Sequence, residues 1–342
     1  MTISAVANPA RDLLTKNIVF FGGKGGVGKT TAAAGFAVAA AATNRQCLIV
    51  STDPAHSLSD IFEVNIKDVE TPLATNLTAL ELDPDNAART HISTVKEHMK
   101  SLVHPRLFGE IDRQLDLARH TPGATEAALL ERVADVMALA GNKYDLVIFD
   151  TAPSGHTVRL LSLPEIMGAW VDGLLKHRAK SSRLGSVLKN FQSEKSAGDD
   201  LSLLDTTRTH EPESLEGRID SLLAVRRRKF IRARDQLRDP ARTAFVLVIN
   251  PDRLSILEGQ DVVTTLGKFD MSVNSLVINR VLTEETPASG SFIEDRRSQE
   301  RTYLDQIEHD FSGLPTIIVP LRARDIHGLN ALRTLGEELM SA

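Results

Sequence analysis

The stretch that decides the fold is Gly22-Gly23-Lys24-Gly25-Gly26-Val27-Gly28-Lys29-Thr30-Thr31. It contains the pattern G-x-x-x-x-G-K-[ST], which is typical of a phosphate-binding loop. With glycine at about 7% of residues, chance would produce this pattern about once in a hundred chains of this length. The loop also needs a strand before it and a helix after it. Apolar residues 18–21 and the alanine-rich residues 31–42 predict both.

The chemistry of the loop assigns roles to its residues. Glycines let backbone N–H groups wrap phosphate oxygens, and the start of the following helix adds a favourable dipole. Lys29 is expected to reach the β- and γ-phosphates, and the Thr30 hydroxyl is expected to bind magnesium. The predicted nucleotide-binding residues of the loop are Gly23, Lys24, Gly25, Gly26, Val27, Gly28, Lys29, Thr30 and Thr31.

Two aspartates follow predicted strands. Asp53 comes after residues 46–51, and Asp150 ends the run YDLVIFD. Each alone would be better explained as a helix cap or a turn residue. Two such residues at strand ends behind a phosphate loop instead predict catalytic chemistry, because ligands of α/β proteins bind at that edge of the sheet. Asp53 could orient or deprotonate water, and Asp150 could hold the water shell of magnesium.

The fold class follows from apolar runs that do not alternate. Such runs indicate strands buried on both faces, and therefore a mostly parallel central sheet flanked by helices. The sequence predicts an α/β P-loop nucleotide triphosphatase with an added helical subdomain. The predicted strands are residues 18–21, 46–51, 77–82, 144–149, 243–249, 273–281 and 316–319.

The domain organisation is predicted to be one ATPase-type domain over residues 1–342. Its nucleotide core would comprise residues 16–83, 143–159 and 241–342, and its helical subdomain residues 84–142 and 160–240. Residues 1–15 are expected to form a frayed leader. The polar stretches 193–216 and 283–298 predict loops.

Composition excludes several classes of protein. The 342 residues carry 40 Lys and Arg against 45 Asp and Glu, a net charge of −5, so no nucleic-acid partner is expected. A single cysteine cannot form an internal disulfide, which fits a reducing cytoplasm. The basic run 226–229 predicts a solvated helix face. Its alternative role is to dock on anionic lipid or on an acidic receptor, and docking on lipid would place the protein peripherally at a membrane.

Four segments together resemble one family. They are KGGVGKT, STDPAHSLSDIF, LTALELDP and DTAPSGHTVRLLSLPE. These segments resemble the ArsA family, which includes the arsenical-pump ATPase and the guided-entry ATPase that delivers tail-anchored membrane proteins. The likeness covers residues 18–82 and 144–165, and it weakens to scattered matches towards the C-terminal end.

The resemblance implies further roles for individual residues. Lys24 would be the deviant Walker A lysine that reaches the partner's nucleotide, so a homodimer is implied. Asp53 would activate water, and Asp150 would be the acid on the magnesium side. Asn279 and Pro320 would contact adenine, and Asp252 would match an acidic residue of the nucleotide site. The implied cofactors are ATP and Mg²⁺.

Departures from the family pattern concern cysteine. The CxxC pair that binds zinc between subunits in some members would fall between Asn279 and Pro320, where no cysteine occurs, so no structural zinc is expected. Cys47 lies on a predicted core strand and is expected to be inert packing. Metalloid coordination by several thiolates of one subunit is therefore excluded.

The predicted function is a magnesium-dependent ATP hydrolase that acts as a nucleotide-switched dimer. By the resemblance, hydrolysis would serve a membrane-related process, which is either arsenite or anion efflux or the targeting of tail-anchored proteins. The expected partner is a membrane channel or receptor, or a hydrophobic tail-anchor client. The alternative is a spatial or assembly switch that resembles MinD. Such a switch normally uses a lipid-binding amphipathic tail, whereas residues 329–339 are amphipathic but acidic at their end.

Overall fold

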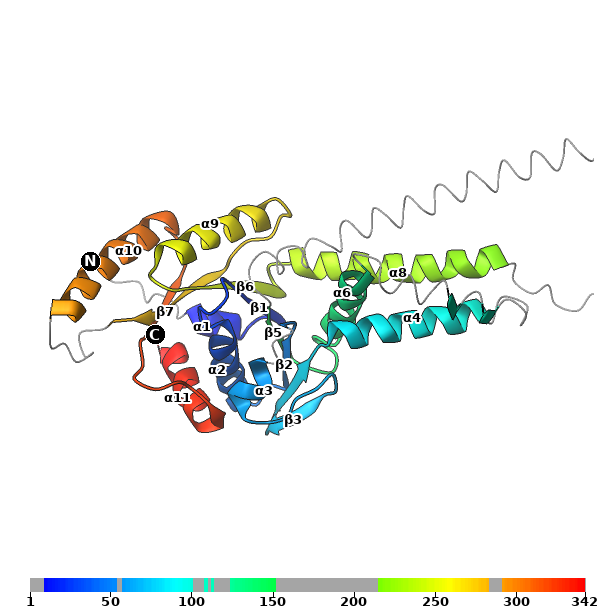
Figure 1. Ribbon diagram of the computed structural model, residues 1–342, viewed down its shortest axis with the longest axis horizontal. Helices are drawn as coiled ribbons and strands as arrows, with labels where there is room; N and C mark the ends of the chain where they lie inside the picture. Colours follow the sequence, from blue (N-terminus) through cyan, green and yellow to red (C-terminus); the bar gives the residue numbers. More distant parts are fainter. Residues whose placement is uncertain are drawn as a thin grey trace, which may run out of the picture. The chain divides into compact units, whose positions relative to one another are not determined.

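The computed structural model describes residues 9–53, 57–100, 108–109, 112–113, 124–151, 215–282 and 291–341 (Figure 1). The chain divides into two compact units. The first is Met1–Ser162 together with Asp235–Ala342, and the second is Leu163–Arg234. In the second unit the described residues are 215–234, which belong to helix α8 (Leu215–Arg238) and carry the basic run 226–229.

The first unit is built on a mixed sheet. Within the described residues the sheet has eight strands in the order β3-β4-β2-β5-β1-β6-β7-β8. All neighbouring strands are parallel except β3 and β4, which pair antiparallel at one edge. The strands are β1 (Ile18–Gly22), β2 (Cys47–Ser51), β3 (Thr71–Ala74), β4 (Leu77–Glu81), β5 (Leu146–Asp150), β6 (Thr243–Ile249), β7 (Ser275–Val281) and β8 (Thr316–Pro320).

The predicted α/β class with a mostly parallel sheet is confirmed. Strands β1, β2, β5 and β6 are buried at every position, as two-sided coverage requires. Each of the seven predicted strands is present, with ends displaced by no more than one or two residues. The sequence did not predict β3, an edge strand whose residues alternate between half-buried and exposed.

One face of the sheet is covered by the helix that follows the phosphate loop and by the last helix of the chain. These are α2 (Lys29–Ala42) and α11 (Gly328–Ser341), which pack against each other (Figure 1). The approach is close, because a Cβ atom added to Gly336 would lie 2.5 Å from the carbonyl oxygen of Gly35. Leu332, Leu335 and Leu339 of α11 are buried in the same core cluster. The amphipathic pattern of residues 329–339 is therefore explained by packing against α2.

The opposite face of the sheet carries aromatic side chains. The rings of Phe20 and Phe149 are stacked with their centroids 4.6 Å apart, and Phe245 continues the row at 6.5 Å from Phe20. Further along the chain, α9 (Arg253–Gly267) follows β6, and α10 (Ser291–Asp310) follows β7. Strands β1 and β2 both run parallel to β5, so the carboxyl ends of the three strands lie at the same end of the sheet. The candidate site lies there.

Two predicted irregular segments are in fact partly helical. Residues 9–13, expected within a frayed leader, form helix α1 (Pro9–Leu13), because Ala10 and Leu13 are buried in the core. Residues 291–298, expected within a loop, begin α10. Although the sequence of α10 is polar, the helix buries some of its side chains, and Glu300 and Ile307 are the least exposed of them.

The expected helical subdomain is only partly described. Helices α4 (Pro84–Lys100) and α6 (Ala124–Met137) pack against each other and belong to the same compact unit as the sheet. Residues 160–214 of the expected subdomain lie outside the described residues, as do residues 1–8 of the expected leader. No described helix is long and apolar enough to cross a membrane.

Candidate nucleotide-binding site

The loop between β1 and α2 has the backbone shape that its glycines predict. Gly23 has φ 148°, and a Cβ atom there would lie 2.1 Å from the carbonyl oxygen of Val248. Gly28 is the N-cap of α2 with φ 94°, and no side chain caps the helix there. The first N–H groups of α2 have no carbonyl partner within the helix. The fold therefore presents unsatisfied donors and a positive dipole to an anion at this point.

Lys29 begins α2 and is almost fully buried, with 6% of its surface exposed. Its Nζ donates a hydrogen bond to the carbonyl oxygen of Lys24 at 3.1 Å. Burial lowers the pKa of the Lys29 amine, whereas the nearby charges of Asp150 and Asp53 act to raise it. The amine is therefore bonded to a backbone carbonyl inside the loop and feels the charge of two carboxylates, in a place where it can neutralise phosphate charge.

Asp150 and Thr30 meet beneath the loop. Thr30 Oγ1 donates to Asp150 Oδ2 at 2.7 Å, and Ser57 Oγ lies 3.4 Å from the same oxygen. Asp150 is fully buried. This burial raises the pKa of its carboxyl to about 7, and the Thr30 hydrogen bond and the Lys29 charge only partly offset that effect. A buried acid at the end of a central strand, bonded to the loop threonine, is the arrangement predicted for the magnesium side of the site.

Asp53 lies two residues beyond β2, on the same edge of the sheet. Its backbone N–H donates to Ser51 Oγ at 3.1 Å, and the preceding Thr52 N–H donates to the Asp150 carbonyl at 3.0 Å. Asp53 stands two residues beyond Ser51, which pairs with Asp150 in the sheet, and the Asp53 charge acts to raise the pKa of both Lys29 and Asp150. The structure thus places Asp53, Asp150 and Lys29 at the same end of the parallel strands, and their catalytic roles stay predictions.

Asn279 lies in β7, and its side chain is hydrogen-bonded to the phosphate loop. Its Nδ2 donates to the Val27 carbonyl at 2.7 Å, and a Cβ atom on Gly28 would lie 2.2 Å from that nitrogen. Asn250, directly after β6, also faces the loop: with its side-chain amide turned so that the nitrogen faces these acceptors, the nitrogen would donate to the Val27 carbonyl at 3.2 Å and to the Asn279 backbone carbonyl at 3.3 Å. Two amides from neighbouring strands therefore hold the crest of the loop.

Comparison with known proteins decides the family. The family model described as anion-transporting ATPase matches residues 16–341. An ATPase named ARSA2 of Chlamydomonas reinhardtii is 31% identical over 330 residues, covering 94% of this chain and 83% of that protein. The chain belongs to the ArsA anion-transporting ATPase family.

Other similar proteins come from plants and ciliates. ATPase GET3B of Arabidopsis thaliana is 33% identical over 338 residues, covering 92% of this chain and 77% of that protein. ATPase ASNA1 homolog 1 of Paramecium tetraurelia is 30% identical over 328 residues, covering 94% of this chain and 92% of that protein. The similarity extends over nearly the whole chain, so this ArsA-family protein is an ATPase and binds ATP.

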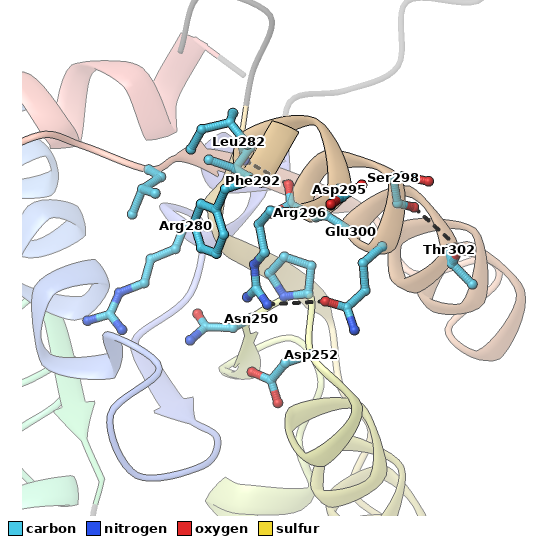
Figure 2. A pocket seen from close by; sticks show the side chains of 14 residues that line it. Asn250, Asp252, Arg280, Leu282, Phe292, Asp295, Arg296, Ser298, Glu300 and Thr302 are labelled. Atoms are coloured by element: carbon cyan, nitrogen blue, oxygen red, sulfur yellow. Dashed lines mark hydrogen bonds between the residues drawn. The ribbon is translucent and has the colours of Figure 1, made fainter. Parts of the chain in front are cut away.

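A pocket of about 870 Å³ lies beside the phosphate-loop edge of this ArsA-family ATPase (Figure 2). Its lining comes from the residues before α9, the end of β7 and the first turns of α10. Asp252 lines this pocket, but its side chain is also the N-cap of α9 and accepts from the Ser255 N–H at 2.9 Å. Pro320 ends β8 and pairs with Val281. Base contacts by Asn279 and Pro320, and a nucleotide contact by Asp252, stay predictions.

Magnesium is implied by the family, and the residues present fit it. Asp150 Oδ1 is buried and has no hydrogen-bond partner among the described residues, although Oδ2 is bonded. An orphaned buried carboxylate oxygen beside a threonine hydroxyl is a hard-oxygen environment suited to the water shell of Mg²⁺. The described residues contain no cluster of three His, Cys, Asp or Glu side chains that could hold a metal by protein ligands alone.

Three site residues were not identified from the sequence as such. Ser57 bonds both Thr30 and Asp150, Asn250 holds the loop crest, and Glu81 caps the start of α3 (Ser57–Phe62). Each lies in or next to a recognised segment, namely STDPAHSLSDIF, INPD or LTALELDP. Their side-chain partners depend on strand register, which the one-dimensional pattern does not give.

Proposed function

We propose that the protein is a magnesium-dependent ATPase that works as a nucleotide-switched homodimer and couples hydrolysis to a membrane-related process. Lys29 and Lys24 neutralise phosphate charge. Asp53 orients or deprotonates the attacking water. Thr30 and Asp150 would hold Mg²⁺, and the bound ion would supply charge stabilisation for the reacting phosphoryl group.

The observation that carries this chemistry is the meeting of three side chains from separate strands and helices. Thr30 bonds Asp150 at 2.7 Å, and the Asp53 N–H bonds the hydroxyl of Ser51, which pairs with Asp150 in the sheet. Ground-state phosphate contacts and the water-handling group are thus distinct parts of one site. Such a separation predicts different kinetic defects for their variants.

The dimer proposal rests on Lys24. Its carbonyl, not its side chain, bonds Lys29, and the loop has no internal need for a second lysine. Its half-buried position near the head of the loop suits a side chain that reaches a second nucleotide across a subunit interface. The charge would then complete the partner's site only in the closed dimer.

The molecule on which ATP hydrolysis acts, the client, would be one that binds without a cysteine thiolate. Cys47 is fully buried in β2, and burial raises the pKa of its thiol to about 12. A thiol in that environment stays protonated and inert at neutral pH. This favours a tail-anchored segment, or an oxyanion held by other groups, over a cysteine-bound metalloid.

The alternative, a MinD-like spatial switch, normally requires an amphipathic helix that is free to bind lipid, and α11 does not meet that requirement. The amphipathic face of α11 is buried against α2 and is not displayed to lipid. Release of α11 would expose Leu332, Leu335 and Leu339, at a cost of about 1.5–3 kcal/mol for each side chain. A membrane-binding role for this helix is therefore disfavoured.

The proposed coupling is tested by the steady-state ATPase rate of purified protein with arsenite, with antimonite, or with a detergent-solubilised tail-anchor peptide. We expect the peptide to change the rate. A scrambled peptide of equal composition is the control. Stimulation by arsenite or antimonite alone would instead support a role in anion efflux, and no response to any of the three would favour the MinD-like alternative.

Cys47 provides a matched prediction for the same assay. Cys47→Ala and Cys47→Ser should leave any stimulated activity nearly unchanged, apart from a packing cost of about 1 kcal/mol. A thiol reagent at pH 8 should label Cys47 only after denaturation, because the folded thiol remains protonated. Arsenite stimulation that vanishes in both variants, with melting temperature preserved, would contradict the inert role of this thiol.

A further inference from the structure

Glu81 is a buried acid for which the proposed chemistry has no role. It ends β4, and only 2% of its surface is exposed. In the sheet Glu81 pairs with Ser51 of β2, and Ser51 pairs on its other side with Asp150 of β5. Glu81 and Asp150 therefore lie at the same level of the sheet, on the two strands that flank β2. Their shared neighbour Ser51 precedes Asp53 by two residues.

The Glu81 side chain holds the first turn of α3. Its Oε1 accepts hydrogen bonds from the backbone N–H groups of Leu58 and Ser59, both at 2.9 Å. Its Oε2 accepts from the Ser59 hydroxyl at 3.0 Å. N–H groups in a first helical turn have no carbonyl partner within the helix, and a negative charge is favourable there. The acid satisfies these donors and fixes the direction of the helix.

Asp150 holds the same helix from the other side of β2. Ser57 Oγ lies 3.4 Å from Asp150 Oδ2 and is also bonded to the Thr30 hydroxyl at 3.2 Å. The first three residues of α3 are thus tied to two buried acids and to the phosphate loop. Ser51, the sheet partner of Glu81, accepts a hydrogen bond from the Asp53 N–H through its hydroxyl at 3.1 Å, so the start of α3 and Asp53 are both held at this end of the strands.

We propose that Glu81 is a positioning residue of the ATPase. By anchoring the start of α3 it holds Ser57 against Asp150 and keeps Asp53 aligned with the reacting phosphate. This inference rests on the proposed role of Asp53. The three hydrogen bonds that Glu81 accepts come from Leu58 and Ser59 of α3, so we expect its loss to affect ATP binding little. A misalignment of about 1 Å at a reacting group can cost about 100-fold in rate.

Apolar packing is the competing explanation for the position of α3. Leu58, Ile61 and Phe62 are buried in the core beside α2 and α11. If that packing alone fixed the helix, Glu81 variants would lose stability without a selective loss of kcat. The two explanations therefore predict different kinetics.

The experiment compares three substitutions. Glu81→Gln keeps the length and one oxygen that accepts both N–H groups. Glu81→Asp keeps the charge but shortens the reach, and Glu81→Met keeps the length but removes the acceptors. ATP KM and kcat are measured with hydrogen exchange of a peptide spanning residues 57–62. We expect kcat within about threefold of the parent for Gln, and about tenfold or more below it for Asp and Met. KM should stay within about threefold throughout.

Hydrogen exchange gives a readout that does not depend on turnover. The amides of Leu58 and Ser59 should exchange faster in Glu81→Asp and Glu81→Met, with β1 and β5 unchanged, and should stay protected in Glu81→Gln. Whichever of the two disruptive variants folds is compared with Gln. Parental kcat in a folded Asp or Met variant would overturn the proposal, as would a loss of kcat in Glu81→Gln with α3 still protected.

Two further variants separate this inference from its premise. Asp68→Asn is the matched control, because Asp68 is a nearly buried acid that bonds Asn86 and Arg132 away from the loop. It should lower the melting temperature and leave kcat unchanged. Asp53→Asn tests the premise: parental kcat there would refute the role of Asp53 itself. A defective Asp53→Asn beside unaffected Glu81 variants would refute only the positioning role.

Discussion

Asp150 carries a buried carboxyl whose protonation is set by the fold. Its pKa is raised from 3.8 to about 7 by burial, so without a bound cation the folded state disfavours the charged form. In the unfolded chain this carboxyl loses its proton near pH 4. The contribution of the Asp150 carboxyl to the free energy of unfolding is therefore fully present below about pH 4 and is lost as the pH rises through 7.

Asp150→Asn should reduce this pH dependence. In EDTA and without nucleotide, the parent should lose up to about 4 kcal/mol of unfolding free energy between pH 4 and pH 8 from this group. The asparagine variant lacks that contribution, so its urea-unfolding free energy should vary less over the same range. Identical pH profiles for the two proteins would show that the carboxyl is not perturbed as described.

At the residue scale, the sequence could predict the chemical groups but not all of their partners. Lys29, Thr30 and Asp150 follow from the loop pattern and from strand ends, and their contacts agree with it. The bond from Asn279 to the Val27 carbonyl spans 252 positions. Only the pairing of β6 with β7 and the close approach at Gly28 create that contact, and no local pattern encodes either.

Elements buried on both faces were the ones that the sequence predicted best. β2, β5 and β6 are short apolar runs rich in β-branched residues, a composition and length that favour a central strand over a buried helix. Polar or short elements were missed because they bury little apolar surface. β3 is an exposed edge strand that contains Pro72, and α10 is a polar helix with few buried side chains.

The contact between α2 and α11 gives a test at the scale of elements. Gly336→Ala should destabilise the fold by about 1–3 kcal/mol, because the added methyl would meet the Gly35 carbonyl and Ala39. Gly267→Ala, in α9, is the matched control, since nothing lies within 4 Å of its added methyl. Thermal unfolding compares the two. A melting temperature as high for Gly336→Ala as for Gly267→Ala would mean that this helix contact is looser than described.

On the scale of the whole molecule, we expect nucleotide-dependent assembly. Mg²⁺ with a transition-state mimic should convert the protein to a closed dimer, because each Lys24 would then neutralise charge on its partner's nucleotide. Lys24→Ala should block both closure and turnover without changing the melting temperature of the monomer. Light scattering that reports a monomer under every nucleotide condition would refute the dimer mechanism.

The central claim is that one site binds ATP through the phosphate loop and uses Asp53 only for the reacting water. The most direct measurement is ATP affinity and single-turnover hydrolysis for Lys29→Ala and Asp53→Asn beside the parent. Lys29→Ala should lose productive binding. Asp53→Asn should bind ATP within about twofold of the parent and hydrolyse it about 100-fold more slowly or worse. Hydrolysis at the parental rate by Asp53→Asn would contradict the claim.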